Sequence, residues 1–181
     1  MLSVGCGSGK TEAHLVERGL RVIAVPLDPV IAAGPAACGV KIADGDLSTA
    51  PKRLAGERFD CLLLLDVLHL VPDPVNVLSS FGALLSTRSS AIFSVPNLSQ
   101  LPAVWGRIRR APPFQDWGNY DKTGVHFTSL DTILDWCRRA GMRIKSIIPV
   151  LPVRARRLGN LAFGLLDGIL ASEFIVVTER N

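Results

Sequence analysis

A chain of 181 residues is long enough to form one domain with a buried core, and its 48% hydrophobic and 20% charged residues are typical of a globular protein rather than a disordered one. The net charge of +4 is mildly basic, and the basic residues are scattered apart from small clusters at 107–110 and 154–157, so nucleic-acid binding is not favoured. No stretch approaches 18 uninterrupted apolar residues, so no membrane span is predicted.

The four cysteines lie far apart, at positions 6, 38, 61 and 137, with no C-x-x-C pair and no Cys/His cluster at zinc-ligand spacing. We therefore predict no metal site, reduced thiols and a cytoplasmic location. The first residues also lack a basic region followed by a long apolar run, so no signal peptide is expected.

Apolar runs alternate with amphipathic stretches in the first half of the chain. The strongest strand pattern is the unbroken apolar run "FDCLLLLD", as expected of a strand buried on both faces. Short connections between strands and helices predict a parallel, doubly wound sheet with right-handed crossovers. The predicted strands are Leu2–Val4, Arg21–Val25, Val40–Ala43, Phe59–Leu65 and Ser90–Val95, and the predicted helices are Thr11–Arg18, with a stripe of Ala13, Val16 and Leu20, and Asp73–Leu85, with a face of Val77, Leu78, Phe81, Leu84 and Leu85.

The pattern changes after residue 96. Residues 97–125 are rich in Pro, Trp, Arg and Gly and form an insertion too long for an ordinary connection. A helix is then expected at Leu130–Ala140, a strand at 142–150, an extra amphipathic helix within 154–171 near Leu158–Leu170, and a last strand at 172–180. No internal repeat is visible, so residues 1–181 are predicted to form a single domain.

The stretch "SVGCGSGKT", residues 3–11, allows two interpretations. Gly9-Lys10-Thr11 could end a phosphate-binding P-loop, but the glycine that should begin such a loop is Val4 here. The "LLLLD" run at 62–66 resembles the magnesium-side strand of a nucleotide hydrolase, although any buried parallel strand with an acidic end looks the same. An ATP- or GTP-hydrolysing protein is therefore the weaker alternative.

Taken from its first glycine, Gly5, the same stretch gives a more specific match to a known family. "LSVGCGSGK", then "FDCLLLLDVLHLVPDPVNVL", then "GNYDKTGVHFTSLDTILDWCRRAGMRI" resemble, in this order and spacing, three segments of the class I S-adenosylmethionine-dependent methyltransferases. The likeness runs over essentially the whole chain. It implies a Rossmann-like, doubly wound α/β fold, with a mostly parallel seven-stranded sheet whose last strand is antiparallel, and S-adenosylmethionine as the cofactor.

The resemblance also implies a set of cofactor-binding positions. The glycine loop would approach the amino-acid and ribose parts of the cofactor, since its glycines have no side chains in the way. Asp46 matches the position that accepts from the adenine amine, with Leu47 beside it, although Asp46 could also simply cap a turn and the glycines could form only a strand–helix bend. The implied cofactor residues are Gly5, Cys6, Gly7 and Gly9 in the loop, Asp28, Asp46 and Leu47 towards adenosine, and Asp66, Val67 and Leu68 at the methionine end.

Two features depart from the family pattern. The acidic residue that usually ends the second strand and binds the ribose hydroxyls is Pro26 here, with Asp28 two residues further on. Asp28 precedes Pro29, the arrangement of a helix N-cap, so it either reaches the ribose or only caps a helix. Met1 stands at the first residue of the first strand, so the family's lead-in helix is missing, in a natural short form or in a fragment.

The acceptor side offers three candidate catalytic residues. His69 follows the fourth strand by one turn, and Asp121 and His126 lie in the "DKTGVHF" segment. This segment resembles one in a methyltransferase subgroup whose members act on small molecules and sugars, although Gly124 replaces the histidine that is usual there. Aromatic residues of the 97–125 insertion could line an acceptor pocket or simply pack on the sheet. The basic and apolar segment 154–170 is either a core helix or a peripheral membrane contact.

The sequence thus predicts a methyltransferase that uses S-adenosylmethionine and acts on O or N of a small molecule or a saccharide. The alternatives are a degenerate, inactive methyltransferase-like binding domain and, behind it, the P-loop nucleotide hydrolase. The sequence does not indicate an oligomeric state.

Overall fold

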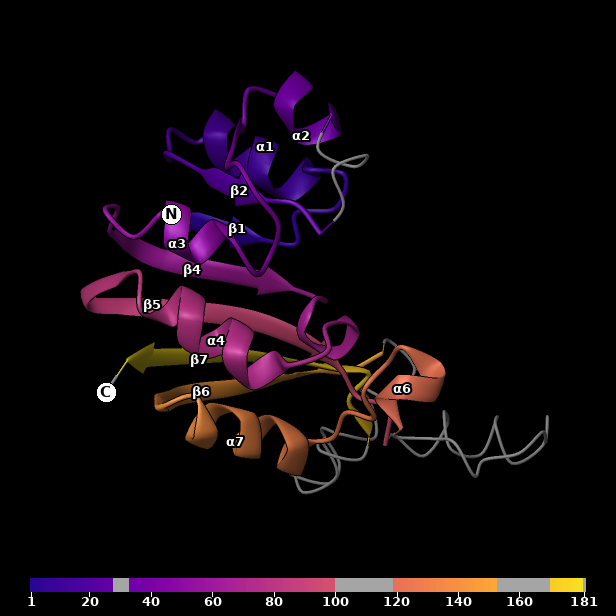
Figure 1. Cartoon of the computed structure of the whole chain (residues 1–181). Helices are drawn as coiled ribbons and strands as arrows, with labels where there is room; N and C mark the ends of the chain where they lie inside the picture. The colour runs from indigo at the N-terminus through magenta and orange to yellow at the C-terminus, as the bar shows by residue number, and fades with distance from the viewer. Residues whose placement is uncertain (28–32, 100–118, 153–169, 181) are drawn as a thin grey trace.

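The computed structural model describes residues 1–27, 33–99, 119–152 and 170–180, and its strands form one sheet (Figure 1). The strand order is β3-β2-β1-β4-β5-β7-β6. All neighbours from β3 to β5 are parallel, whereas β7 runs antiparallel to both β5 and β6. The predicted seven-stranded, mostly parallel sheet with an antiparallel last strand is confirmed. The strands are β1 Leu2–Val4, β2 Ile23–Val25, β3 Lys41–Ile42, β4 Phe59–Leu65, β5 Leu85–Pro96, β6 Met142–Val150 and β7 Glu173–Arg180.

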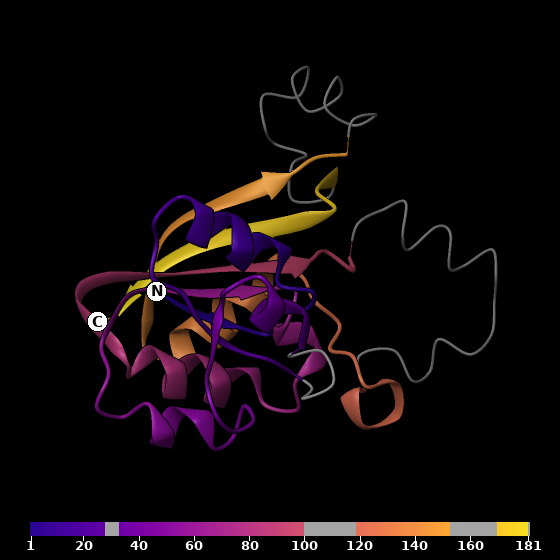
Figure 2. The same cartoon turned by 90° about the horizontal axis from the view of Figure 1, so that it is seen from above.

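Helices cover both faces of this sheet. Viewed from above, α3, α4 and α7 lie on one face and α1 lies on the other (Figure 2). The core is correspondingly divided: a large cluster that includes Phe81 and Ile133 fills the α4 and α7 side, and a small one around Val22 and Ala24 lies beneath α1. The helices are α1 Lys10–Glu17, α2 Ala33–Ala37, α3 Ala50–Arg53, α4 Pro74–Gly82, α6 Tyr120–Thr123, α7 Leu130–Arg139 and the short 3-10 helix η1 Leu68–Leu70.

Three details of the predicted elements are wrong. The α4 helix ends at Gly82 instead of Leu85, since Leu85 already pairs with Phe59 at the start of β5. The buried Leu84 and Leu85 therefore enter the core from the loop and the strand, and β5 begins well before Ser90. At α1, Leu20 lies beyond the end of the helix and is 47% exposed, so it does not belong to the predicted apolar stripe.

The predicted insertion at 97–125 and the predicted extra helix within 154–171 fall mostly outside the described residues. Of the 97–125 insertion, only 97–99 and 119–125 are described, and they include α6. The expected extra helix near 158–170, both arginine clusters and Asp28 also fall outside. Among the helices that the structure does describe, none has both the length and the apolar character to cross a membrane.

Candidate functional site

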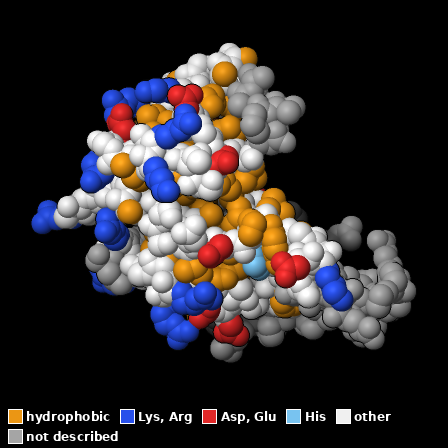
Figure 3. Space-filling view, in the orientation of Figure 1, with side chains coloured by type: hydrophobic (Ala, Val, Ile, Leu, Met, Phe, Trp, Pro, Cys, Tyr) orange, Lys and Arg blue, Asp and Glu red, His pale blue; other side chains and the backbone are white. Residues whose placement is uncertain are grey.

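Three hollows lie along the carboxyl edge of the sheet, the edge to which the arrow of β4 points in Figure 1. One hollow, about 400 Å³, lies beyond β2 and β3, and we call it the adenosine-side hollow after the part of the cofactor that the resemblance would put there. The loop hollow, about 210 Å³, lies beyond β1, and the outer hollow, about 430 Å³, lies beyond β4 and β5. On the face shown in Figure 3, hydrophobic side chains gather over the segment after β4, while Lys and Arg lie mostly toward the opposite edge. The loop between β1 and α1 thus lies in the middle of the row.

The three glycines of this loop have different physical roles. Gly5, Gly7 and Gly9 all adopt positive φ angles, of 80°, 48° and 74°, which favour glycine. A Cβ atom on Gly5 would lie 2.0 Å from Val67 Cγ2, and one on Gly9 would lie 2.7 Å from Pro35, whereas one on Gly7 would meet nothing within 4 Å. Gly5 and Gly9 therefore permit close packing of the protein on itself, and Gly7 leaves the backbone open to a ligand.

Cys6 and Glu12 also line the loop hollow; the sequence indicated Cys6 as a binding residue but did not indicate Glu12. Burial, and then the charge of Glu12, raise the pKa of the Cys6 thiol, so this buried cysteine stays protonated and unreactive at neutral pH. Glu12 is only 3% exposed, and the Ser3 hydroxyl donates to its Oε1 atom at 2.6 Å. No sequence signal singled out Glu12, because a glutamate in the first turn of a helix normally faces water.

Asp46 caps a turn and also lines the adenosine-side hollow. Its Oδ1 atom accepts from the backbone N–H and hydroxyl of Ser48 and of Thr49, at 2.8 to 3.0 Å. These hydrogen bonds, those from the Ser48 and Thr49 side chains first, lower the pKa of Asp46 to about 2. Oδ2 accepts no hydrogen bond from the described residues, and Asp46 lines the adenosine-side hollow, so the turn leaves one carboxylate oxygen available to a ligand. Leu47 instead packs on the core and does not line this hollow.

The end of β2 has no acidic side chain in its described part. The strand stops at Val25, and the buried Pro26 and the exposed Leu27 line the adenosine-side hollow with apolar surface. Asp28, expected to reach the ribose or to cap a helix, lies outside the described residues, so its role stays a prediction.

At the end of β4, the three predicted neighbours face different ways. Asp66 is exposed, has a positive φ of 53° and borders the outer hollow. Val67 and Leu68 are 1% and 0% exposed, and Val67 packs against Gly5. Their side chains therefore belong to the core, and any contact with a ligand would come from their backbone atoms.

His69 borders the outer hollow with an unusual ring environment. Its Nδ1 atom is buried and has no hydrogen-bond partner among the described residues. Burial lowers the pKa of this histidine, the nearby Asp66 opposes that shift, and His126 adds to it. His69 is therefore neutral at pH 7, and Nε2 is the nitrogen left to act in the hollow.

His126 makes several contacts with the chain itself. Its backbone N–H donates to His69 O and its Nε2 lies 2.9 Å from Val71 O, while its ring stacks on Tyr120 at 4.5 Å and meets the edge of Trp136. We call this arrangement the clamp: His126, Tyr120 and their bonds to the η1 segment, including Tyr120 Oη to Leu70 O at 2.9 Å. The clamp ties α6 to the segment that carries His69.

Asp121 and Gly124 also belong to α6. Asp121 is exposed in its first turn and borders none of the three hollows, so the described geometry does not place it with His69. Gly124, which replaces the expected histidine, ends the helix with a φ of 67°, a conformation that favours glycine.

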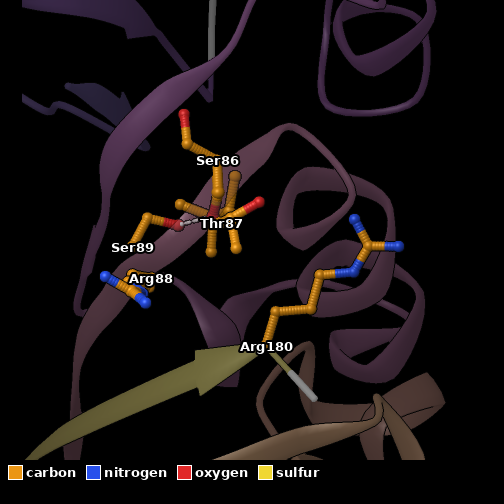
Figure 4. A pocket seen from close by; sticks show the side chains of 6 residues that line it. Ser86, Thr87, Arg88, Ser89 and Arg180 are labelled. Atoms are coloured by element: carbon orange, nitrogen blue, oxygen red, sulfur yellow. Dashed lines mark hydrogen bonds between the residues drawn. The ribbon is translucent and has the colours of Figure 1, made fainter.

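A fourth hollow, about 320 Å³, lies at the opposite edge, between the start of β5 and the end of β7. It contains hydroxyl groups and two arginines, Arg88 and Arg180. Figure 4 shows their guanidinium groups pointing in different directions, and Arg180 donates to Ala83 O. The two charges do not converge on one point, and we assign no ligand to this hollow.

The comparisons with known proteins agree with this geometry. Residues 1–147 match the family described as Methyltransferase domain. A ubiquinone biosynthesis O-methyltransferase from Cereibacter sphaeroides is 27% identical over an alignment of 153 residues, which covers 78% of this chain and 59% of that protein. The chain thus spans less than two thirds of the length of this curated relative.

Solved structures share the fold over 99% of the chain. A S-adenosylmethionine-dependent methyltransferase from Mesorhizobium loti is 20% identical, with a TM-score of 0.66 and 90% of its own length covered. One from Archaeoglobus fulgidus is 15% identical, with a TM-score of 0.70 and 85% covered. The cofactor of this family is S-adenosylmethionine, and the open Gly7 backbone and the free oxygens of Asp46 and Glu12 suit its adenosine and amino-acid parts. The chain belongs to the methyltransferase domain family and has the class I S-adenosylmethionine-dependent methyltransferase fold.

Proposed function

We propose that this protein transfers the methyl group of S-adenosylmethionine to an oxygen or nitrogen of a small-molecule acceptor. The observation that carries the proposal is the row of three hollows along one sheet edge, with the glycine loop in the middle. Ligands of open α/β sheets bind at this carboxyl edge. Such a row can hold a nucleoside, the amino-acid chain attached to it, and an acceptor beyond β4 in line with them.

In the adenosine-side hollow, Asp46 would hold the adenine amine through its free Oδ2 atom. Its pKa of about 2 keeps this carboxylate ionised at any physiological pH, so it can only accept. Pro26 and Leu27 would supply apolar contact but no hydrogen bond to the ribose hydroxyls. The lost hydrogen bonds predict binding about tenfold to a hundredfold weaker than with an acid there, unless Asp28 compensates.

In the outer hollow, His69 is the residue we assign to proton transfer. The cofactor, when bound, supplies an electrophilic methyl group, and the protein has to align an acceptor atom with it. A neutral His69 can take a proton from a hydroxyl or an ammonium group through Nε2. To accept a proton at Nε2, the neutral ring has to carry its own hydrogen on Nδ1, where it is buried without a partner among the described residues. The cost of this tautomer makes His69 a weak base, and burial also lowers its pKa.

The acceptor class follows from the lining of the outer hollow. Leu70 and Pro96 are apolar, while Asp66 and Glu173 are acidic. Two carboxylates disfavour an anionic acceptor, so a neutral or cationic molecule with an apolar body fits best. The name of the 27% identical relative makes a hydroxyl the first acceptor group to test. A saccharide acceptor and a cytoplasmic location stay predictions.

The test has two stages. Calorimetric titration of the purified chain with S-adenosylmethionine, with Mg-ATP as control titrant, is expected to show binding of the former alone. Binding of Mg-ATP alone would revive the P-loop interpretation, and binding of neither would leave a degenerate domain.

Transfer of a labelled methyl group is then measured across phenols, catechols, amines and sugars. We expect His69→Gln to lower kcat on the best hydroxyl acceptor while cofactor affinity stays unchanged. The exposed His14→Gln variant serves as the control. Cofactor binding without transfer to any acceptor would support the inactive binding domain instead.

A further inference from the structure

We infer that Glu12 binds the ammonium group of the amino-acid part of the cofactor, an inference that rests on the proposed function. Glu12 lies outside the set of residues that the sequence indicated. It borders the loop hollow together with Gly7, whose backbone is open to a ligand. A buried carboxylate in this place favours a positively charged ligand group.

The charge of Glu12 is only partly satisfied by the protein. Its side chain is 3% exposed, and Oε1 accepts from Ser3 Oγ at 2.6 Å. Oε2 has no hydrogen bond or ion pair with any part of the chain that the structure describes. Buried carboxylates are costly unless they are paired, so a cation that enters the loop hollow gains an unusually favourable partner there.

The other polar groups of the hollow complete the match. Lys10 borders it from the first position of α1, and the N-terminal N–H groups of an α-helix favour negative charge. One hollow therefore offers a negative group and a positive end, as an ammonium and a carboxylate on one carbon require. A nucleotide phosphate in the same hollow would meet Glu12, so the geometry disfavours a P-loop role for Gly9-Lys10-Thr11.

The experiment compares two ligands on three proteins by calorimetry. The ligands are S-adenosylhomocysteine and its deaminated analogue, in which hydrogen replaces the ammonium group. The proteins are the unmodified chain, Glu12→Gln, which keeps an acceptor for Ser3, and the control Glu17→Gln, which removes an exposed carboxylate from the same helix.

We expect the unmodified chain and Glu17→Gln to prefer S-adenosylhomocysteine by about tenfold or more, and Glu12→Gln to lose this preference. Glu12→Gln that retained the full preference while only its thermal stability changed would overturn the inference and make Glu12 a structural residue. An unmodified chain that bound S-adenosylhomocysteine with no preference would overturn it as well. Failure of the unmodified chain to bind either ligand would overturn the proposed cofactor site itself.

Discussion

At the residue scale, the candidate site depends on the surroundings of single residues, which the sequence alone does not show. The motif Gly5-x-Gly7-x-Gly9 looks uniform, yet Val67 occupies the space beside the first glycine and Pro35 the space beside the third. The middle glycine, Gly7, has open space beside it. This division separates the requirement for folding from the requirement for binding, and it can be tested position by position.

Gly5→Ala is expected to destabilise the fold more than Gly7→Ala. Both substitutions place alanine at a positive φ, which costs about 1–2 kcal/mol. Only Gly5→Ala adds overlap with Val67, for a further 1–3 kcal/mol or so. Urea denaturation measures both, and a larger loss of stability for Gly7→Ala than for Gly5→Ala would contradict the assigned roles.

His69 predicts a specific pH dependence of stability. Its folded pKa lies below the unfolded value of about 6.5, so the unfolded chain binds the proton more readily. The contribution of neutral His69 is complete above that value and is lost as the pH falls through it toward the lowered folded pKa. Denaturation curves of His69→Gln should depend less on pH between about 7 and 5 than those of the exposed-site control His14→Gln. Parallel curves for the two variants would argue against a buried neutral ring.

At the element scale, sequence patterns located all seven strands and missed only the first part of β5, whose residues look polar. The predicted and observed bounds of the Phe59–Leu65 strand are identical, because an unbroken apolar run of this length is typical of a strand buried on both faces of a sheet. The start of β5 was missed because the residues "STRSS" are polar and show no strand pattern. In this part of β5 the pairing with β4 is also irregular, with a register shift between Phe59 and Cys61 of β4. The short α2 was missed within a Gly- and Pro-containing turn sequence.

The candidate site was also only partly predictable from the sequence. The glycine loop, Asp46 and His69 lie on the sheet edge expected for them, because the order of strands fixes where their ends meet. The role of Glu12 depends on its contact with Ser3, nine residues away, and on the burial that follows. Such a contact becomes visible only after the helix is docked on the sheet.

The clamp gives a prediction about local opening. Tyr120→Phe removes the hydrogen bond to Leu70 O and keeps the ring that stacks on His126. One such bond contributes about 0.5–1.5 kcal/mol, so exchange of the His126 amide hydrogen should become roughly 2- to 12-fold faster. The Ile133 amide, which donates to Ser129 O in α7, is the internal control. Equal exchange at His126 in both proteins would show that Tyr120 does not secure α6.

At the scale of the whole molecule, the ligand contacts come from elements that are far apart in the chain. β1, β3 and β4, with the loops that follow them, converge on one edge, while the larger core fills the α4 and α7 side of the sheet. A bound cofactor would connect these elements directly. It should therefore stabilise the native sheet as a whole against unfolding.

Thermal unfolding measures this coupling. At a concentration 100 times its Kd, a ligand that binds only the native state adds about 2.7 kcal/mol, which corresponds to roughly 5 to 11 °C in Tm for a chain of this size. We expect S-adenosylhomocysteine to produce such a rise and Mg-ATP to produce none. An unchanged Tm at saturating S-adenosylhomocysteine would indicate that the site no longer binds its family's cofactor.

The antiparallel β7 has a consequence for how the protein is made on the ribosome. β6 pairs only with β7 among the described strands, and 22 residues (151–172) separate the end of one from the start of the other. At about 5–20 residues per second, translation leaves β6 without its sheet partner for roughly one to five seconds. Until β7 is in place, the β5 edge that β7 covers and the backbone of β6 have no partner strand, and open edges of this kind drive aggregation. Nascent chains stalled before residue 173 should therefore be the most chaperone-dependent state of this protein.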